Sequence, residues 1–498
     1  MQTSSKFSSR RALLLGGAAI VSATAVGFDL SRTKPLSAAD ISGTRKPLAI
    51  PPLDRGEMLD GVRQFSLKVQ DGETAFFADL VTKTRGINGN YLGPVLRFRK
   101  GETIRANVTN TLKESTTFHW HGFNLPAKAD GGPHQIIKSG TTWSPEFKVL
   151  ENASTMWFHA HMLGQTAQQV WQGLAGMVII DDDNSDALNL PSTYGVDDIP
   201  VVLQDRLFDE LGGMAYSSSM GSRMLGLQGD IPVVNGTVMP FLEVVSGLVR
   251  LRLLNGANAS IYGLEFSDQR EFRQIASDGG LLEAPVSMRH LRLAPGERAE
   301  IIVELSENET VFLKSVSIPD NYGLMTKMMG GQTPNFDILE LRAKGKLSTS
   351  SDLPAKLTSL PTPVAPKAAK KRRFVLEMVG MGMMGGDSFA INGKPMDISV
   401  INNVVPKGQF EIWEIFNAGP MAHPFHVHNT QYRILDRSNI PPAANEAGLK
   451  DTVLVNPGET VRILVKFENY TDPARPYMYH CHILEHEDGG MMGQFTVV

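Results

Sequence analysis

Four His-x-His pairs constrain this chain more than any other feature of its sequence. Of the 12 histidines in 498 residues, eight form these pairs and two more stand close to them. A strand alternates its side chains between two faces, so residues two apart project from one face and can reach one neighbouring ion. Four pairs therefore supply enough imidazoles for a cluster of several ions. The pairs are His119 and His121, His159 and His161, His426 and His428, and His480 and His482.

The last pair encloses Cys481, the only cysteine of the chain. In a strand, the Cys481 sulfur faces away from the imidazoles of His480 and His482, so three consecutive residues can serve two different centres. A turn or a short helix after Leu484 would return the residues that follow to the cysteine side. A cysteine, two histidines and a weak axial methionine form the ligand set of a blue-copper site. The candidates for that site are His423, Cys481, His486 and Met491.

The order and spacing of these motifs resemble those of the multicopper oxidases, and most closely those of the bacterial periplasmic copper efflux oxidases, which are laccase-like cuprous oxidases. The segments that carry the resemblance are 119–122, 130–133, 157–161, 423–428 and 480–492. The resemblance implies four copper ions, one of type 1 at the site above, one of type 2 and two of type 3. It implies that His119 and His426 bind the type 2 ion. The implied type 3 ligands are His121, His159, His161, His428, His480 and His482.

The activity implied by the resemblance is one-electron oxidation of Cu(I), of phenolic donors or of both, coupled to four-electron reduction of O₂ to water at a three-copper cluster. A role in copper tolerance is implied too, and family members of this form are usually monomers. Reduction of O₂ consumes protons, and Asp130 and Glu487 match the acidic residues of the family that supply them. From the residues alone, Asp130 before two glycines also suits a turn, and Glu487 also suits a solvated surface.

Methionines form a second pattern, with four of them in the seven residues 378–384. Thioethers favour Cu(I), although methionine also fills gaps in protein cores; the interleaved glycines favour the first use. The resemblance places Met378 and Met421 at substrate-copper ligands of the copper efflux oxidases. Gly419 and Met383 replace the two aspartates that accompany them, and a long Met- and His-rich insert is absent, so a more open site for phenols is expected. The candidate substrate-copper residues are Met378, Met381, Met383, Met384 and Met421.

The rest of the chain predicts an all-β fold. A weak repeat begins at the Asn-Gly steps of residues 88, 235 and 392, at intervals of about 150 residues, an ordinary domain length. Short runs of Val, Ile, Leu and Phe between turn residues are typical of antiparallel sandwiches. Together with the resemblance, this predicts three cupredoxin-like Greek-key β-sandwich domains, the middle one without copper ligands. The expected domains are 40–183, 184–345 and 374–498, with 346–373, rich in Ser, Pro, Ala and Lys, as a linker.

The start of the chain resembles an export signal. Arg10 and Arg11 precede a run of small and apolar residues that ends near Phe28, so residues 1–39 are typical of a twin-arginine signal and the run is too short for a membrane anchor. No later stretch is apolar enough to cross a bilayer, and we expect a periplasmic protein. A single cysteine forms no intrachain disulfide. The balance of 48 basic and 52 acidic residues argues against a nucleic-acid partner.

Other functions fit parts of the pattern. A copper-binding or storage protein of the cell envelope, without turnover, would explain the methionines. A structural envelope protein could share the fold, but the complete ligand set argues against it. A zinc hydrolase needs fewer ligands than four His-x-His pairs provide, and the four pairs favour oxygen reduction over the nitrite reduction of related copper enzymes. The sequence therefore favours a multicopper oxidase.

Overall fold

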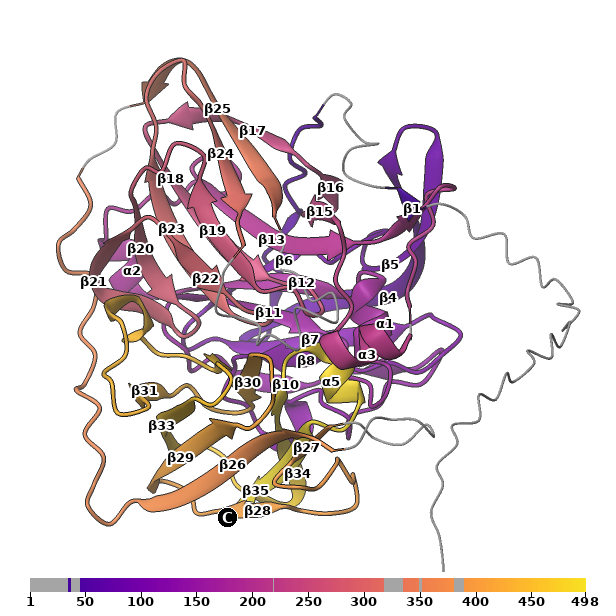
Figure 1. Cartoon of the computed structure of the whole chain (residues 1–498), viewed down its shortest axis with the longest axis vertical. Helices are drawn as coiled ribbons and strands as arrows, with labels where there is room; N and C mark the ends of the chain where they lie inside the picture. The colour runs from indigo at the N-terminus through magenta and orange to yellow at the C-terminus, as the bar shows by residue number, and fades with distance from the viewer. Residues whose placement is uncertain (1–34, 37–44, 218, 318–334, 349–351, 380–388) are drawn as a thin grey trace, which may run out of the picture.

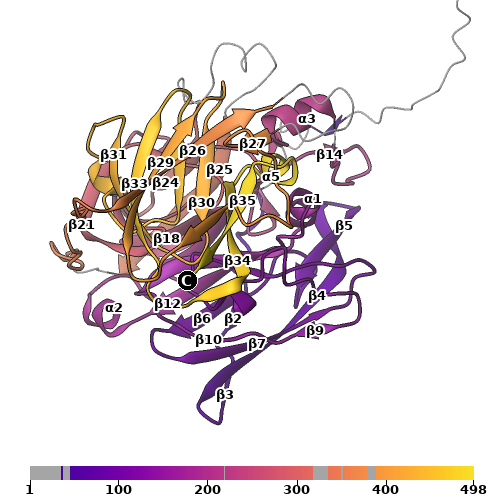
Figure 2. The same ribbon diagram turned by 90° about the horizontal axis from the view of Figure 1, so that it is seen from below.

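The computed structural model describes residues 35–36, 45–217, 219–317, 335–348, 352–379 and 389–498. These residues form six large β-sheets and one small sheet, in which β1 (Pro35–Leu36) pairs with β14 (Phe208–Asp209). Along the chain, the large sheets are arranged as three successive pairs. The two sheets of each pair enclose a hydrophobic cluster. We call them the first pair (residues 53–181), the middle pair (198–348) and the third pair (370–497). Figures 1 and 2 show all three pairs in contact around a common centre.

The first pair packs two sheets around a core of alternating inward residues. In β7, for example, Ile104, Ala106 and Val108 are buried while the residues between them are half-exposed, which is the period of two that a strand with one buried face requires. One sheet contains β3 (Glu57–Leu59), β4 (Val62–Phe77), β5 (Leu80–Ile87), β7 (Thr103–Asn110), β9 (Thr142–Trp143) and β10 (Glu146–Lys148). The other contains β2 (Leu53–Asp54), β6 (Val95–Arg99), β8 (His119–His121), β11 (Ser154–His159) and β12 (Ala175–Asp181).

The middle pair contains a strand that is buried on both faces. In β18, Leu251 and Leu253 enter the core, whereas Arg250 and Arg252 on the opposite face form buried ion pairs with Asp198 and Glu300. One sheet contains β13 (Asp198–Arg206), β15 (Ile231–Val234), β16 (Thr237–Val238), β18 (Leu248–Asn255), β20 (Phe272–Ser277), β21 (Gly280–Met288) and β23 (Arg298–Glu304). The other contains β17 (Phe241–Ser246), β19 (Tyr262–Phe266), β22 (Leu291–Leu293), β24 (Thr310–Ser315) and β25 (Phe336–Ser348).

The third pair carries the C-terminal histidines, and its core includes Cys481 and Met491. The strand of the closing motif lies in the interior of its sheet, between β30 and β35. One sheet contains β26 (Lys370–Met378), β27 (Phe389–Ile391), β29 (Phe410–Asn417), β31 (Arg433–Arg437) and β33 (Thr460–Lys466). The other contains β28 (Asn403–Val405), β30 (His423–Val427), β32 (Thr452–Val455), β34 (Asp472–Cys481) and β35 (Met492–Val497).

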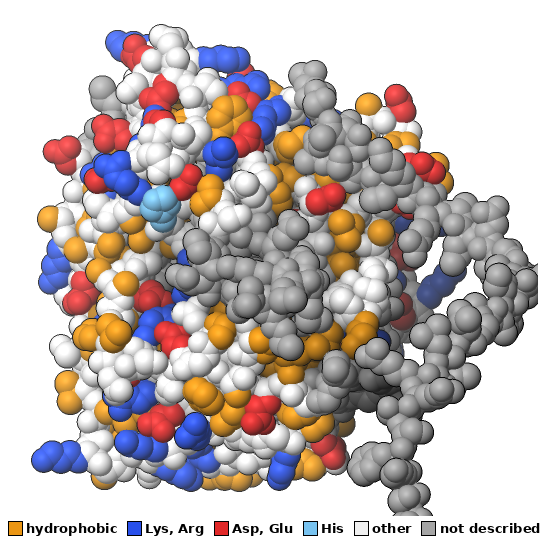
Figure 3. Space-filling view, in the orientation of Figure 1, with side chains coloured by type: hydrophobic (Ala, Val, Ile, Leu, Met, Phe, Trp, Pro, Cys, Tyr) orange, Lys and Arg blue, Asp and Glu red, His pale blue; other side chains and the backbone are white. Residues whose placement is uncertain are grey.

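Short helices connect these sheets. Helices α1, α3 and α5 lie side by side in both views, and α5 follows Ile483 as the sequence predicts (Figures 1 and 2). The helices are α1 (Thr166–Trp171), α2 (Asp183–Ala187), α3 (Met220–Leu225) and α5 (Leu484–Asp488), with the 3₁₀ turns η1 (Ala127–Ala129) and η2 (Ala444–Glu446). Among the residues described, no helix has the length and apolarity needed to cross a membrane. The face in Figure 3 carries acidic and basic side chains interspersed, in keeping with the net charge of −4.

A buried carboxyl group fixes the loop that leaves β8. Glu151 is 5 % exposed and accepts hydrogen bonds from the backbone amides of Asn124 and Leu150, at 2.7 and 3.1 Å. The side chain of Asn429 accepts a hydrogen bond from the amide of Leu125, at 3.1 Å, and so ties the same loop to the third pair. Burial raises the pKa of Glu151 to about 7.

This pKa predicts how stability depends on pH. The folded protein holds a proton on Glu151 that the unfolded chain, with a carboxyl pKa near 4.5, releases. This difference in proton binding adds to the free energy of unfolding at low pH. The added stability is lost as pH rises towards 7, by about 3 kcal/mol at most. In Glu151→Gln we expect a smaller fall in thermal midpoint between about pH 5 and pH 7. Parallel profiles for the two proteins over that range would contradict the prediction.

Candidate metal centres

The eight paired histidines meet in one buried place between the first and third pairs of sheets. Strand β8 lies against β11, which places His119 opposite His159, and β30 lies against β34, which places His426 opposite His480. The rings from the two ends of the chain stack on one another, with centroids 3.9 Å apart for His119 and His428. All eight side chains are at most 1 % exposed. The structure thus brings together all the paired histidines that the sequence singles out.

Their free ring nitrogens converge as the ligands of metal ions do. The six residues expected for type 3 copper form two triads, in each of which the ligating atoms lie within 4.8 Å of one another. In one triad, Nε2 of His480 lies 3.2 Å from Nε2 of His161 and 3.3 Å from Nε2 of His428. Nitrogens bound at about 2.0–2.1 Å to one tetrahedral ion lie about 3.3 Å apart. The triads are His121, His159 and His482, and His161, His428 and His480, while His119, His121 and His426 form a third group.

Burial keeps these imidazoles in the form that binds metal. Removal from water is the largest cause that lowers the pKa of each of the paired histidines for which a shift is found, and neighbouring imidazoles lower several further. A neutral imidazole offers a lone pair, whereas an imidazolium does not. Buried ring nitrogens without a protein partner are Nε2 of His119, His159 and His426, Nδ1 of His121, and both nitrogens of His482. An unsatisfied buried polar atom is costly, so this set of nitrogens fits bound copper.

The opposite nitrogen of most of these rings is anchored by a fixed acceptor. Such anchoring sets the ring orientation and the tautomer of a metal ligand. Backbone carbonyls serve four rings and carboxylates serve others. The acceptors of Nδ1 are the carbonyl of Asp130 for His119, of Ala160 for His159 and of Asp451 for His426, each at 2.9 Å, and of Cys481 for His480 at 3.0 Å.

Asp130 and Glu487 are both buried beside the histidines. Glu487 is 1 % exposed, and its two carboxylate oxygens lie 3.1 Å from Nδ1 of His161 and 3.2 Å from Nδ1 of His480. It is therefore not a solvated surface residue. Asp130 contacts Nδ1 of His428 through Oδ2, at 2.8 Å, and burial raises its pKa to about 6. Both carboxyl groups lie where a proton can pass to or from a histidine of the cluster.

Asp130 also occupies a tight turn, so both roles considered for it from the sequence are compatible with its position. The next residue, Gly131, has a positive φ of 78°, and a Cβ there would lie 1.8 Å from the carbonyl oxygen of Phe118. Only glycine fits such a position. The turn brings the Asp130 carboxylate under the rings from both ends of the chain.

A second centre lies on the other side of Cys481. Its sulfur is 3.5 Å from Nδ1 of His423 and 3.8 Å from Nδ1 of His486, and the two nitrogens are 3.2 Å apart. A sulfur and a nitrogen bound to one ion at about 2.3 and 2.0 Å lie about 3.5 Å apart. Helix α5 returns the chain so that Met491, which is fully buried, bonds through its carbonyl oxygen to the amide of Cys481 at 3.0 Å. Burial raises the pKa of the Cys481 thiol, so a bound cation is what would keep it a thiolate.

The methionines occupy different environments. Met421 is 2 % exposed in the core of the third pair, and Met378, at the end of β26, is half-buried against that core. Met381, Met383 and Met384 lie outside the described residues. Another helix contributes to the mononuclear centre through its backbone, since Nε2 of His486 lies 3.2 Å from the carbonyl oxygen of Met224 in α3.

Residues that the sequence analysis did not single out for a role complete the site. Asp451 accepts from Nε2 of His121 at 3.0 Å, although 330 positions separate them in sequence. Arg298 of the middle pair bonds to that carboxylate. The indole of Trp157 stacks on His159, with ring centroids 4.2 Å apart. Asp451 and Arg298 stand in no repeated pattern, and only the folded chain brings them to the histidines. Trp157 precedes His159 by two residues in β11, within the segment 157–161 that carries the resemblance.

Comparisons with known proteins agree with this arrangement. Family models described as multicopper oxidase match residues 68–185 and 366–498. The multicopper oxidase mco of Staphylococcus haemolyticus is 38 % identical over 442 residues, which is 88 % of this chain and 89 % of that protein. The cell division protein FtsP of Escherichia coli is 34 % identical over 468 residues, 92 % of this chain and 94 % of that one. A crystal structure of a laccase from Pediococcus acidilactici has a TM-score of 0.82 at 36 % identity, covering 92 % of this chain and 94 % of its own.

A second solved structure, McoA multicopper oxidase from Aquifex aeolicus, has a TM-score of 0.81 at 34 % identity and covers 91 % of this chain and all of its own. The similarity spans nearly the whole length of both relatives and solved structures, and it includes the two sheet pairs that hold the histidines. The chain belongs to the multicopper oxidase family and is an oxidoreductase whose cofactor is copper, with four ions of types 1, 2 and 3.

Proposed function

We propose that this protein couples one-electron oxidation of Cu(I), of phenolic donors or of both at a type 1 copper to the four-electron reduction of O₂ to water at a trinuclear copper cluster, with a role in copper tolerance. The observation that supports this most directly is the run His480-Cys481-His482. Its sulfur lies in the mononuclear centre, within 3.8 Å of two histidine nitrogens, while both imidazoles lie in the histidine cluster. A few covalent bonds therefore connect the two centres.

The proposed ligands follow from the free nitrogens and the converging groups. His423, Cys481, His486 and Met491 would hold type 1 copper, and His119 and His426 would hold type 2 copper. The two triads would hold the type 3 pair. Bound copper supplies one-electron redox chemistry and binds oxygen. The chain supplies neutral, oriented imidazoles and excludes water from both centres, since their ligands are at most 1 % exposed.

Asp130 and Glu487 are the proposed proton-handling residues. O₂ reduction to water takes up four protons, and a carboxyl group beside the reacting site speeds such transfers. Glu487 can hold a proton at an oxygen that faces Nδ1 of His161 or of His480. Asp130 can do so beside His428. The two carboxyl groups approach the cluster from α5 and from η1, so protons can arrive from two directions.

Further parts of the proposal concern the whole chain. We propose three cupredoxin-like Greek-key domains at residues 40–183, 184–345 and 374–498, with a linker at 346–373 and an export signal at 1–39. The two ends of this linker overlap strands, because β25 ends at Ser348 and β26 begins at Lys370. The site of action would be the periplasm and the protein a monomer. The division into three domains is supported by the separate hydrophobic core of each pair of sheets. The donor site for Cu(I) would involve Met378, Met381, Met383, Met384 and Met421.

Oxygen uptake separates the proposed function from a role without turnover. The similarity to the cell division protein FtsP keeps a role without turnover as a second candidate, beside copper storage. A multicopper oxidase supplied with Cu(I), or with a substituted phenol in the presence and absence of excess Cu(II), consumes one O₂ for every four electrons delivered. Copper-loaded protein that consumes no oxygen with either donor would exclude the oxidase and favour the other roles.

Glu487→Gln is expected to slow turnover while the blue absorbance stays intact. The amide presents only one acceptor oxygen to the two histidine nitrogens and takes up no proton at neutral pH, so a loss of about 10²-fold or more is expected for a proton-transfer group. Steady-state oxygen uptake and the visible spectrum are the measurements. The matched control is Glu485→Gln on the same helix, whose carboxylate faces Asn258 at 2.8 Å instead of a histidine. Equal rates for Glu487→Gln and wild type would remove the proposed role.

Met378→Leu combined with Met383→Leu tests the donor site. Leucine keeps the volume but removes the soft sulfur. We expect oxidation of Cu(I) to slow relative to oxidation of a bulky phenol, measured as the ratio of the two kcat/KM values. A conservative control is Met288→Leu, whose side chain packs against the core of the middle pair. If Cu(I) oxidation is unaltered in the double variant, the methionines are not the donor site.

A further inference from the structure

His121 is held in the opposite sense to the other anchored histidines of the cluster. For His119, His159, His426 and His480, the nitrogen bonded to an acceptor is Nδ1. In His121 it is Nε2, which lies 3.0 Å from Oδ1 of Asp451 and 3.2 Å from Oγ1 of Thr452. Its Nδ1 is buried and has no protein partner. A carboxylate at Nε2 keeps the proton on that nitrogen, which leaves the Nδ1 lone pair for the metal.

This inversion depends on the carboxylate of Asp451, which is itself held by Arg298. Asp451 is fully buried. The Arg298 guanidinium donates to both of its oxygens, from Nη1 to Oδ1 at 2.7 Å and from Nη2 to Oδ2 at 2.5 Å. This two-point contact fixes the plane of the carboxylate as well as its position. The orientation of His121 is therefore set by Asp451, which contacts the ring, and by Arg298, which contacts Asp451.

Arg298 is held in turn by all three pairs of sheets. Its remaining N–H groups donate to the carbonyl oxygens of Thr155 in the first pair and of Gly296 and Asp278 in the middle pair, each at 3.0 Å. With Asp451 in the third pair, all five N–H groups have acceptors. The side chain is fully buried, so it has one permitted position.

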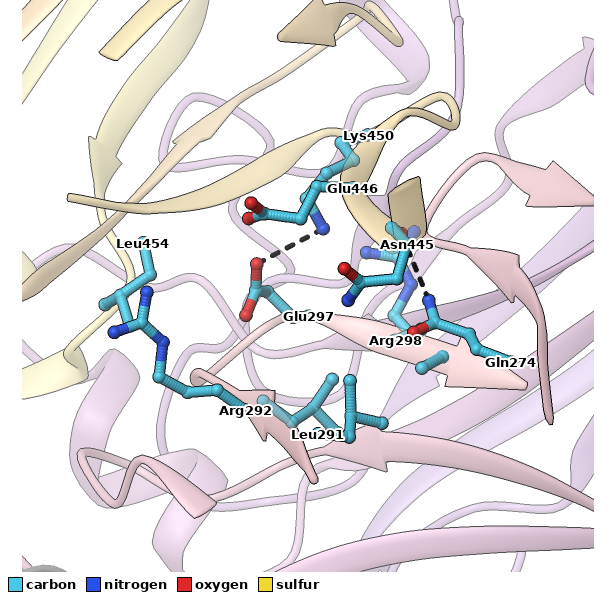
Figure 4. A pocket seen from close by; sticks show the side chains of 11 residues that line it. Gln274, Leu291, Arg292, Glu297, Arg298, Asn445, Glu446, Lys450 and Leu454 are labelled. Atoms are coloured by element: carbon cyan, nitrogen blue, oxygen red, sulfur yellow. Dashed lines mark hydrogen bonds and ion pairs between the residues drawn. The ribbon is translucent and has the colours of Figure 1, made fainter. Parts of the chain in front are cut away.

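Lys450 binds the other carboxylates near Arg298, so Arg298 is available to bind Asp451. The nearest competing carboxylate, that of Asp278, lies 3.9 Å from Nη1 of Arg298. Lys450 binds it at 2.9 Å and also binds Glu297 at 3.2 Å. Figure 4 shows the Lys450 ammonium facing Glu297, in a cavity of about 170 Å³ between the middle and third pairs. Lys450 therefore pairs with Asp278 and Glu297, and Arg298 pairs with Asp451.

The same turn of the middle pair touches a second ligand. Gly296 has a positive φ of 82°, and a Cβ there would lie 2.8 Å from Cδ2 of His482. His482 and His121 belong to one triad. The turn that contains Gly296 and Arg298 thus forms a wall of the histidine cluster, although the middle pair contributes no histidine to it.

We propose that Arg298 is a positioning residue for the copper cluster: acting through Asp451, it selects Nδ1 of His121 as the nitrogen that faces the metal. The inference rests on the proposed ligand role of His121. It gives the middle pair a part in building the cluster, beyond connecting the two pairs that carry the ligands. Removal of Arg298 would leave a buried carboxylate without its cation, and the carboxylate would then turn or take up a proton. His121 would lose its fixed orientation.

The test uses copper-loaded wild type, Arg298→Met and Asp451→Asn, and measures copper per chain, blue absorbance and the electron paramagnetic resonance spectrum. A coupled pair of cupric ions gives no resonance signal, whereas a pair with one ion lost or displaced does. We expect both variants to retain the blue absorbance and to gain such a signal. Against a copper chelator, they should lose cluster copper at about 10–100-fold lower chelator concentration than wild type, the usual cost of removing a residue that orients a ligand.

Arg252→Met is the matched control. Arg252 is a buried arginine of the same sheet pair that binds Asp198 through two nitrogens and also contacts Thr155, at 3.2 Å, but touches no histidine. It should lose stability while its cluster copper and resonance spectrum match wild type. Asp451→Asn keeps the side-chain volume, so it decides the matter if Arg298→Met does not fold.

Two results would overturn the inference: wild-type spectra and chelator resistance in both Arg298→Met and Asp451→Asn, or the same changes in Arg252→Met. Wild-type protein that binds no coupled copper pair would instead overturn the proposed function, and the inference with it. The two failures are therefore distinguished by the wild-type spectrum alone.

Discussion

The structure depends on the burial of eight imidazoles at one point, four from each end of the chain. Several of their ring nitrogens face one another without a protein partner, and a buried polar atom that makes no bond costs free energy. Bound copper satisfies these atoms, so metal binding and the docking of the first and third pairs of sheets are linked. In the proposed function, the cluster is at once the functional centre and the interface between the two ends of the chain.

The protein prepares this interface with fixed acceptors. Backbone carbonyls, Asp130, Asp451 and Glu487 determine which nitrogen of a ring is free, so most of the imidazoles are oriented by the fold and not by the metal alone. Burial then keeps the rings neutral. In the proposed function, the carboxyl groups of Asp130 and Glu487 have two roles, because a group that orients a histidine is also in place to exchange a proton with it.

Much of the site could be predicted from sequence because its ligands repeat with the period of a strand. The His-x-His spacing and the position of Cys481 between two histidines indicate the chemistry without knowledge of the fold. A turn or a short helix was expected after Leu484, and α5 begins at Leu484. The similarity to multicopper oxidases confirms the family and the copper cofactor, and the mostly β architecture agrees with the all-β prediction. The residue roles and the domain boundaries stay predictions.

Other parts of the site have no local pattern to reveal them. The carboxylate that orients His121 is 330 positions away, and its cation belongs to a segment without ligands. Which buried charges form such an ion pair depends on how the sheets pack. Here Lys450 binds Asp278, and Arg298 binds Asp451. Whether Glu487 is exposed likewise depends on how α5 packs, so the sequence left both alternatives open.

The most direct test of the account is to count copper and record the visible spectrum of wild type and Cys481→Ser. The account predicts four coppers per chain in wild type and a blue absorbance, roughly near 600 nm, from the thiolate ligand. In the serine variant the colour and one copper should be lost, while the three coppers held by imidazoles remain. Colourless wild-type protein, or protein with far fewer than four coppers after full metal loading, would contradict the account.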